Sequence, residues 1–376
     1  MLNLIYWSPF IGNVGTIKSC INSAISFKKF SKKECNVKII NVCGEWDNFK
    51  DIIKQNNIEL INLTFSFIKY LPKTGFIKSR VSYILIFLIS FFPLLRLLKK
   101  EKNAFFIAHL ITSLPLFLNF FFNLKSKMIL RISGYPRLHF LRKSFWKLVT
   151  KKIYLITCPT TELKVNLTNL DIFDNSKVKF LPDAIIDIKD FLLKKNKPID
   201  IPTKKKFILS VGRLTKQKNY KYLINEIEEF IKKNNDYDLI ILGEGEERES
   251  LNKIIADSDL SDRVFLLGHK NNQYSYMVKA SAFILTSLWE EVGFVIVESA
   301  LSNLLIFSSN CPNGPKEFLS NGEAGILFNT NTKNALKKCI DNINDDNLNK
   351  KIKAKKNSLK YTRFRHFLRF KEILQI

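Results

Sequence analysis

Two carboxylates, Glu290 and Glu298, flank an apolar run within the stretch TSLWEEVGFVIVESALSN. Charges are costly to bury beside such residues unless they have a partner. We expect a strand over 282–287 and a helix over 296–303, with Glu290 just past the strand and Glu298 in the first turn of the helix. Glu290 could accept sugar hydroxyls, and Glu298 could accept two hydroxyls of a ribose. The alternative is that Glu290 and Glu291 are solvated and Glu298 only complements the helix dipole.

Two cations lie upstream in the stretch SVGRLTKQKNY, which follows another expected strand. Gly212 permits a tight turn, and Arg213 and Lys218 come next on the loop. Arg forks onto phosphate oxygens, Lys supplies a point charge, and the free N–H groups of the following helix would add donors for an anion. The stretch predicts a phosphate site, with a basic surface loop as the alternative.

Glycines recur beside these polar side chains. Gly243 and Gly245, in LGEGEER after a third expected strand, suit close approach of the backbone to a nucleotide or, alternatively, an ordinary turn. Gly293, beside Glu290, offers a backbone that a ligand can approach without meeting a Cβ atom.

The segments that must position these residues alternate between strand and helix patterns. In the C-terminal half we expect strands over 206–214, 237–245, 263–269, 282–287, 304–309 and 324–329, and helices over 223–234, 247–260, 274–281 and 296–303. In the N-terminal half we expect strands over 2–7, 36–44, 104–110, 127–134, 153–160 and 177–185, and a helix over 16–30. Strands that alternate with helices predict parallel sheets.

We therefore predict an α/β protein with two Rossmann-like doubly wound domains, at residues 1–187 and 206–358, that face each other across a cleft. Residues 188–205 are polar and Lys-rich and predict a linker. Residues 359–376 have the pattern of a basic amphipathic helix, for which a membrane-facing role is one reading. Ligands of such domains bind at the carboxyl ends of the strands, where the polar residues above lie.

The net charge of +26 over 376 residues indicates contact with phosphates, nucleic acid or anionic lipid. Residues 1–183 carry most of the excess, with 28 Lys and Arg against 10 Asp and Glu. A compositional bias toward Lys is the alternative. A nucleic-acid-binding surface would interleave cations with exposed aromatic residues, whereas the Phe residues here cluster in apolar runs. We therefore expect an anionic membrane surface, and no nucleic acid, as a partner of the N-terminal half.

The six cysteines form no C-x-x-C pair and no cluster with zinc-binding spacing, which suits a reducing cytosol. The N-terminal residues lack the pattern of a signal peptide. Residues 81–98 are apolar but contain Pro93 and Arg96 and fall short of the ~20 apolar residues of a spanning helix. We interpret them as a buried or interfacial helix rather than a transmembrane one, and expect a cytoplasmic protein, peripheral on the inner face of the membrane.

The E-x7-E pair after TS-x-W, the upstream VGRL with Lys218, and CPNGPKEFLSNGEAGILF (311–328) together resemble the retaining glycosyltransferases of family 4, which have the two-Rossmann-domain fold called GT-B. The resemblance covers residues 206–330 well and the N-terminal half loosely, through SPFIGNVGT, IAHLITSLP and RISGYP. The family commonly has Gly-Phe-Gly after the first glutamate, whereas this chain has Glu291, Val292, Gly293 and Phe294. Glu291 could therefore share or take over the role of Glu290.

The resemblance implies that Arg213 and Lys218 hold the donor diphosphate and neutralise the charge of the departing nucleotide, with Glu290 on the donor sugar. It implies retention of configuration, with no metal and no cofactor beyond the nucleotide-sugar substrate. Because no nucleophile for a double displacement is evident in the sequence, we expect substitution on the same face of the sugar. The last helix would pack back on the N-terminal domain. The donor-binding residues would be Glu298, Gly293, Phe294, Glu291, Gly212, Gly243 and Gly15.

In the N-terminal half, the resemblance places Gly12 and Gly15 near the diphosphate and the acceptor, with a plain turn as the alternative. His109 would contact the donor sugar or the acceptor, although a single histidine is often structural. Arg131 and the following SGYP would line the acceptor side.

The function implied is transfer of a hexose or N-acetylhexosamine from a nucleotide-sugar to a glycan or polyprenyl-linked acceptor in surface polysaccharide biosynthesis. The CPNGPKE loop resembles that of enzymes using UDP-linked hexoses or N-acetylhexosamines, which implies UDP as the nucleotide. The alternatives are an epimerase or phosphorylase of the same fold, a nucleic-acid-binding protein, and a non-catalytic scaffold attached to a membrane.

Overall fold

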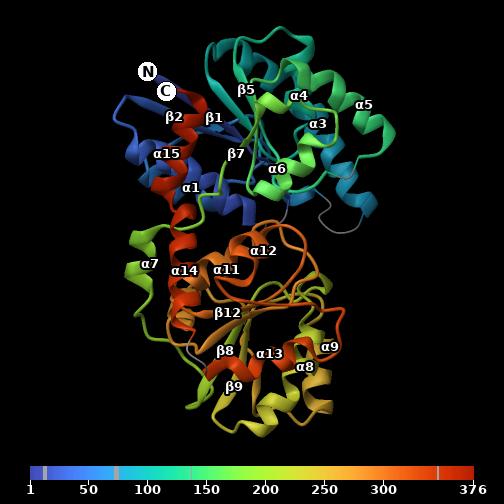
Figure 1. Cartoon of the computed structure of the whole chain (residues 1–376). Coiled ribbons are helices and arrows are strands. Elements are labelled where there is room, and N and C mark those ends of the chain that lie inside the picture. The colour runs from blue at the N-terminus through green and yellow to red at the C-terminus, as the bar shows by residue number, and fades with distance from the viewer. Residues whose placement is uncertain (12–14, 72–75, 137, 345–346) are drawn as a thin grey trace. The chain divides into compact units, whose positions relative to one another are not determined.

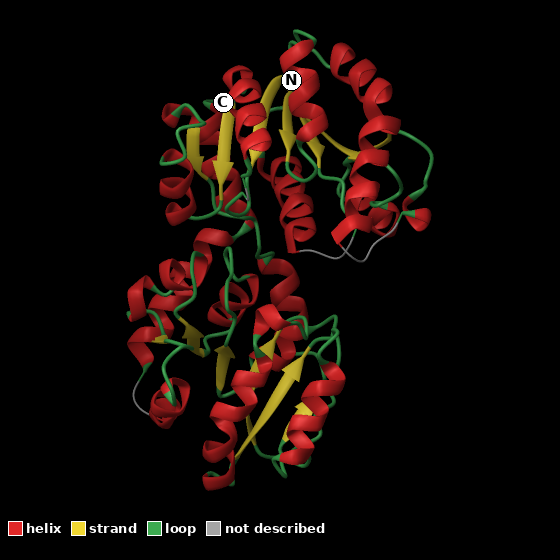
Figure 2. Cartoon of the chain, turned by 90° about the vertical axis from the view of Figure 1, so that its right-hand side faces the viewer, coloured by secondary structure: helices red, strands yellow, loops and turns green. Residues whose placement is uncertain are grey.

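Two compact units make up the computed structural model, which describes residues 1–11, 15–71, 76–136, 138–344 and 347–376. The first unit joins Met1–Ala184 to Arg363–Ile376, and the second is Ile185–Thr362. Each unit contains one parallel sheet with helices on both faces, as Figures 1 and 2 show. This arrangement confirms the prediction of two Rossmann-like domains.

The first unit has a seven-stranded sheet in the order β3-β2-β1-β4-β5-β6-β7. Its strands are β1 (Leu2–Trp7), β2 (Cys35–Asn41), β3 (Glu59–Asn62), β4 (Phe105–Ala108), β5 (Lys127–Arg131), β6 (Leu155–Cys158) and β7 (Val178–Phe180). Its helices are α1 (Gly15–Phe30), α2 (Lys50–Gln55), α3 (Phe76–Lys100), α4 (Ser113–Phe121), α5 (Phe140–Val149), α6 (Thr161–Thr168) and α15 (Arg363–Leu374). The strand order changes direction between β1 and β4, which is where ligands of doubly wound sheets bind.

The second unit has a six-stranded sheet in the order β10-β9-β8-β11-β12-β13. Its strands are β8 (Lys206–Val211), β9 (Tyr237–Leu242), β10 (Val264–Leu266), β11 (Ala282–Leu285), β12 (Leu305–Ser309) and β13 (Ile326–Phe328). Its helices are α7 (Ile188–Lys194), α8 (Tyr220–Lys233), α9 (Arg248–Asp257), α10 (Gln273–Met277), α11 (Phe294–Leu301), α12 (Gly314–Phe318), α13 (Ala335–Ile340) and α14 (Leu348–Ser358). The corresponding change of direction lies between β8 and β11.

Burial of both sheet faces explains why the strands are continuous hydrophobic runs instead of alternating apolar and polar residues. In β1, Leu4 and Tyr6 pack in the core that contains α1 and α15, whereas Ile5 and Trp7 pack in the core that contains α3 and α4. The second unit repeats the pattern on β8, where Ile208 faces α8 and its neighbours face α10 and α11. Sheets of this kind need a helix layer on each face, which the chain supplies.

The second unit begins at Ile185, whereas the sequence indicated that the first domain ends at residue 187. The segment expected to be a linker, residues 188–205, begins with the helix α7. Within α7, Phe191 is buried and its ring lies 5.2 Å from that of Tyr274 in an edge-to-face contact. The apolar side chain therefore gives this Lys-rich segment a place in the core of the second unit.

The C-terminal helix α15 lies along α1 (Figure 1). Phe27 of α1 contacts the rings of Phe367 and Phe370 at 5.2 and 5.4 Å, and Arg363 donates to the side-chain oxygen of Asn22. Aromatic contacts and hydrogen bonds of this kind make α15 part of the first unit.

Candidate active site

The polar residues of the second unit gather where β8 and β11 end side by side in the sheet. The loop after β8 begins at Gly212 and continues through a short 3₁₀ turn at Lys216–Lys218 into α8. The loop after β11 contains Glu290 and leads to α11. Because parallel strands end at the same edge of the sheet, both loops lie at the change in strand order.

Lys218 and Glu290 form a largely buried ion pair between these two loops, 72 residues apart in the sequence. Ser287 adds a hydrogen bond from its hydroxyl to the same carboxylate oxygen of Glu290, at 2.7 Å. Pairing offsets part of the cost of burying a carboxylate and an ammonium group at the edge of a core. It also holds the Lys218 ammonium at one position beside the sheet.

Three hydrogen bonds to backbone carbonyls join the two loops around this pair. The Leu288 amide donates to the Gln217 carbonyl at 2.8 Å, and the Gln217 side-chain amide donates to the Trp289 carbonyl at 2.9 Å. The Thr286 hydroxyl donates to the Lys218 carbonyl at 2.8 Å. Gln217 was not predicted, because a glutamine on a polar loop has no distinctive pattern in the sequence.

The loop after β9 packs so closely on the loop after β8 that two of its positions require glycine. A Cβ atom on Gly243, whose φ is +152°, would lie 1.8 Å from the Gly212 carbonyl oxygen. A Cβ atom on Gly245 would lie 2.2 Å from the Leu214 carbonyl oxygen. These contacts account for both glycines by themselves, so a nucleotide contact at Gly243 stays a prediction.

Gly293 is the N-cap residue just before α11 and has the left-handed conformation, with φ +74° and ψ 69°. A side chain at this φ would strain the backbone, although its Cβ would meet nothing closer than Ile296 at 3.5 Å. Phe294 is the first residue of α11 and is partly buried. The glycine therefore sets the angle at which the chain enters the helix beside Glu290.

The prediction that Glu298 lies in the first turn of its helix is wrong, because α11 begins at Phe294 and Glu298 is its fifth residue. Glu298 also lies deeper than the sequence indicates, with 2% of its surface exposed. The Gln273 side-chain amide donates to one carboxylate oxygen, and the Tyr274 hydroxyl donates to the other at 3.4 Å. A ribose would have to replace the Gln273 amide to reach this carboxylate. The role of Gln273 was not predicted, because the contact depends on how α10 packs beside α11.

The remaining predicted donor-site residues lie at the surface or near it. Arg213 is exposed, and Glu291 is partly buried, with the Asn313 side-chain amide 3.4 Å from its carboxylate. In the first unit, Gly15 is exposed at the first residue of α1, whereas Gly12 lies outside the described residues.

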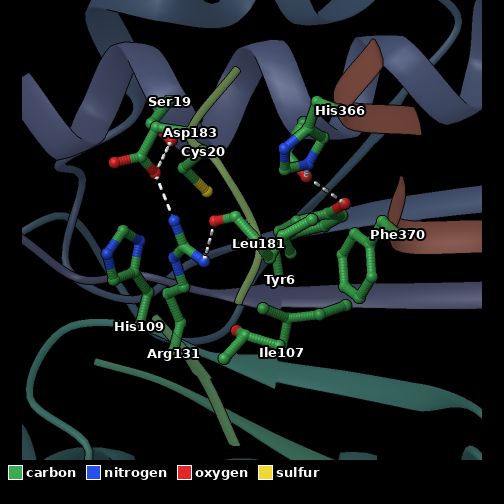
Figure 3. A pocket seen from close by; sticks show the side chains of 12 residues that line it. Tyr6, Ser19, Cys20, Ile107, His109, Arg131, Leu181, Asp183, His366 and Phe370 are labelled. Carbon is green, nitrogen blue, oxygen red and sulfur yellow. Dashed lines mark hydrogen bonds and ion pairs between the residues drawn. The ribbon is translucent and has the colours of Figure 1, made fainter. Parts of the chain in front are cut away.

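Arg131 and Asp183 form a buried ion pair of 2.7 Å inside the first unit (Figure 3). The guanidinium also donates to the Leu181 carbonyl at 2.8 Å, and the Ser19 hydroxyl donates to Asp183 at 2.5 Å. Burial by itself would raise the pKa of the Asp183 carboxyl, but the Arg131 charge and the Ser19 hydroxyl hold that pKa below its usual value. Arg131 therefore lies inside the domain, and its acceptor-side role stays a prediction.

Two buried histidines, His109 and His366, border a cavity that Arg131 and Asp183 also line (Figure 3). The cavity has a volume of about 20 Å³, room for about one water molecule. His109 follows β4 at the change in strand order and shares a 2.5 Å hydrogen bond with Ser133. His366 of α15 bonds to the Ser23 hydroxyl at 2.8 Å and to the Pro182 carbonyl at 2.6 Å. A cavity of this size does not admit a sugar, and the His366 contacts tie α15 to the sheet edge.

The two histidines predict an acid-sensitive first unit. Burial lowers the pKa of His109 to about 4, with a further contribution from the Arg131 charge, and burial also lowers the pKa of His366 to about 4. Both values lie below the 6.5 of an exposed histidine, so the unfolded chain binds more protons between pH 6.5 and pH 4. The free energy of unfolding should fall across this window by roughly 3 kcal/mol for each histidine, at about 1.4 kcal/mol per pKa unit.

Melting temperatures between pH 7 and pH 4 measure this loss. His366→Gln should flatten the pH dependence, whereas His139→Gln, at an exposed histidine of the same unit, should leave it unchanged. A flat profile in the wild type between pH 6.5 and pH 4.5 would contradict the prediction.

Asp-x-Asp spacings occur at Asp236 and Asp238 and at Asp257 and Asp259. Asp238 is buried and accepts a 2.5 Å hydrogen bond from Arg263, which uses it in a structural ion pair. Within the part of the chain that the structure describes, no group of three or more His, Cys, Asp or Glu side chains is arranged to hold a metal ion.

Comparison with protein families assigns the segment that carries this site. Residues 193–361 match the family model Glycosyl transferases group 1. The matched segment includes both site loops, with Lys218, Glu290 and Glu298. The match bears out a glycosyltransferase domain in this segment, whereas membership of family 4 and the retaining mechanism stay predictions.

Curated relatives match part of the chain. An N-acetylgalactosamine-N,N'-diacetylbacillosaminyl-diphospho-undecaprenol 4-alpha-N-acetylgalactosaminyltransferase of Campylobacter jejuni is 31% identical over 62% of this chain and 65% of its own length. The chain thus spans just under two thirds of that relative's length. It spans smaller shares of two uncharacterized glycosyltransferases, one of Methanocaldococcus jannaschii and one of Haemophilus influenzae.

Solved structures match the whole chain. Anabaena Alr3699/HepE in complex with UDP and glucose has a TM-score of 0.73 at 15% identity, and the match covers 100% of both chains. Staphylococcus aureus TarM has a TM-score of 0.75 at 14% identity over 100% of this chain and 99% of its own. At such identities the likeness is one of fold, and it confirms the GT-B fold class.

Proposed function

We propose that the protein is a glycosyltransferase that moves a sugar from a nucleotide-sugar to a glycan or polyprenyl-linked acceptor with retention of configuration. The observation that carries this proposal is the Lys218–Glu290 pair, which two loops hold at the change in strand order of a group 1 glycosyltransferase domain. The second unit thereby combines a charged site with the fold position at which nucleotides bind.

The charges of this site suit departure of a nucleoside diphosphate. Glu290 keeps the Lys218 ammonium in place, and the exposed guanidinium of Arg213 is available on the same loop. As the bond from the sugar to the diphosphate breaks, negative charge grows on the phosphate oxygens, and the cations of Lys218 and Arg213 would stabilise it. Transfer to the same face of the sugar would then proceed without a covalent intermediate.

UDP is the nucleotide we propose, with a hexose or N-acetylhexosamine as the sugar. Two observations support this choice: the CPNGPKE loop of the sequence, and the structural likeness to Alr3699/HepE in complexes with UDP and with UDP-glucose. Glu298 would bind the ribose after displacing the Gln273 amide. We propose that no metal takes part, a point that EDTA tests directly.

A lipid-linked acceptor is supported by the name of the Campylobacter jejuni relative, which includes diphospho-undecaprenol. An acceptor of this chemistry lies in a membrane, and surface polysaccharide biosynthesis is the process we propose. The protein would then work in the cytoplasm, at the inner face of an anionic membrane.

A thermal-shift panel of UDP, GDP, ADP and UDP-sugars, with EDTA present, tests the donor site. We expect UDP and one UDP-sugar to raise the melting temperature by a few degrees, since a ligand at a hundredfold excess over its Kd stabilises the folded state by about 2.7 kcal/mol. Arg213→Ala should abolish most of the shift, because it removes an exposed phosphate ligand without altering the core.

Lys221→Ala is the matched control, since Lys221 is an exposed cation on the adjacent helix α8 and should keep the full shift. No shift with any nucleotide would overturn the proposed donor site. A shift that EDTA removes would overturn metal independence alone.

A further inference from the structure

The outward side of α3 exposes a run of large apolar side chains. We define the apolar face of α3 as Val81, Ile84, Leu85, Leu88 and Phe92, all of which are exposed. Their spacing of three and four residues places them in one stripe along the helix. Leu88 is 63% exposed and Phe92 65%, and contiguous apolar surface of this kind marks an interaction site.

The opposite side of the same helix is part of the domain core. Ser82, Ile86, Ser90, Leu94 and Leu98 are buried at four-residue spacing, and the apolar ones pack with residues of the sheet. Residues Arg80–Lys100 are long and apolar enough to cross a membrane, yet a third of the apolar window is buried within the protein. Crossing a bilayer would strip this buried stripe from the sheet, so the helix can meet lipid only along its outward side.

Aromatic residues extend the apolar face onto the next helix. The Phe91 ring lies 5.2 Å from that of Phe92 and 6.0 Å from that of Phe122, just after α4. Phe121, the last residue of α4, is more than half exposed. The ends of α3 and α4 therefore form one continuous apolar surface.

Cations border this surface. Arg80 is exposed at one end of the stripe, and Arg96, Lys99 and Lys100 are exposed at the other. The Lys99 ammonium lies 6.0 Å from the centre of the Phe122 ring, which joins the basic end to the aromatic residues. A border of cations around an apolar stripe is the pattern of a helix at a lipid interface.

The charge of this region does not follow from a general bias toward lysine. Residues 60–161, which contain α3, α4 and α5, have 17 Lys and Arg and one acidic residue, Glu101. Glu101 is itself paired with Lys38. By contrast, residues 185–362 have 28 Lys and Arg against 23 Asp and Glu, so the same composition is nearly balanced in the second unit.

We propose that the apolar face of α3 is a docking surface for the anionic phospholipid bilayer, with the helix lying flat in the interface and its cations on the headgroups. Apolar side chains enter the lipid, and the bordering Lys and Arg attract the negative surface. The inference deepens the proposed function, because an enzyme acting on a lipid-linked acceptor must hold its first unit at the membrane.

Flotation of the full-length protein with vesicles tests the docking surface. We expect binding to vesicles of phosphatidylcholine and phosphatidylglycerol and much weaker binding to phosphatidylcholine alone. Added salt should weaken the binding, since it screens the attraction of the cations. Leu88→Gln with Phe92→Gln should lower the partition coefficient at least about tenfold, because two apolar side chains no longer leave water.

Glutamine is chosen because it adds no charge, so any loss reflects the apolar contact. Leu193→Gln is the matched control: Leu193 is also 63% exposed but lies on α7 of the second unit, and this variant should bind as the wild type does. In a Phe92→Trp variant, bilayer insertion should shift the emission of the new tryptophan to shorter wavelength, measured as the difference from the wild type.

Equal vesicle binding by the double variant and the wild type would overturn the docking surface. Self-association that the double variant abolishes, without vesicle binding by the wild type, would also overturn it and assign the face to a second copy of the chain. The UDP-induced thermal shift, measured on the same double variant, should be unchanged. If UDP shifted the melting temperature of neither the wild type nor the double variant, the result would instead count against the proposed function.

Discussion

Lys218→Ala should lower turnover by roughly 10²–10³-fold, the loss expected when one preorganised donor to a developing negative charge is removed. Arg213→Ala should cause a loss of similar size for the same reason. The two variants differ in stability. Arg213 is exposed and its removal should leave the melting temperature unchanged, whereas removal of Lys218 leaves the buried carboxylate of Glu290 without its cation. Sugar transfer from the donor identified by thermal shift measures turnover, and calorimetry measures stability.

A second substitution separates catalysis from folding at this pair. Lys218→Ala combined with Glu290→Gln removes both charges, so it should recover most of the lost stability without restoring turnover. Lys221→Ala serves as the control, because this exposed cation of α8 lies outside the site. Near-normal turnover in both Arg213→Ala and Lys218→Ala would contradict the assignment of these cations to the diphosphate.

Asp183→Ala should destabilise the first unit by about 3–5 kcal/mol, which is the usual cost of leaving one charge of a buried ion pair without its partner. Arg131 would remain buried, with only the Leu181 carbonyl as an acceptor among the contacts described above. For a unit of this size the loss corresponds to a fall in melting temperature of roughly 10 °C. Differential scanning calorimetry can follow the transition of the first unit separately if the two units melt apart.

Asp174→Ala is the matched control, since Asp174 is an exposed aspartate of the same unit whose carboxylate accepts hydrogen bonds from the nearby Ser176 amide and hydroxyl. Asp183→Ala combined with Arg131→Met removes both charges and should recover part of the lost stability. The UDP-induced shift of the second unit should survive in each variant. A loss below about 1 kcal/mol in Asp183→Ala would show that the Arg131 charge is stabilised in another way.

The strands could be predicted from the sequence because each is a short, continuous apolar run with a turn after it. Every expected strand of the second half is present with shifted ends, from β8 to β13. The exception in the first half is β3 (Glu59–Asn62), an edge strand whose residues are exposed or half-buried. Its sequence lacks the apolar run that burial on both faces produces, and this is why the pattern missed it.

The sequence by itself determined the two parallel sheets and the positions of Arg213, Lys218 and Glu290 after strands, because apolar periodicity and loop residues are local properties of the chain. Only the tertiary structure decided which distant groups meet. Lys218 pairs with Glu290 because β8 and β11 are neighbours in the sheet, and Arg131 meets Asp183 because their strands end at one edge. Glu298 is buried beneath Gln273 for a similar reason, the packing of α10 on α11. Such contacts follow from strand order and helix packing, which no spacing along the chain specifies.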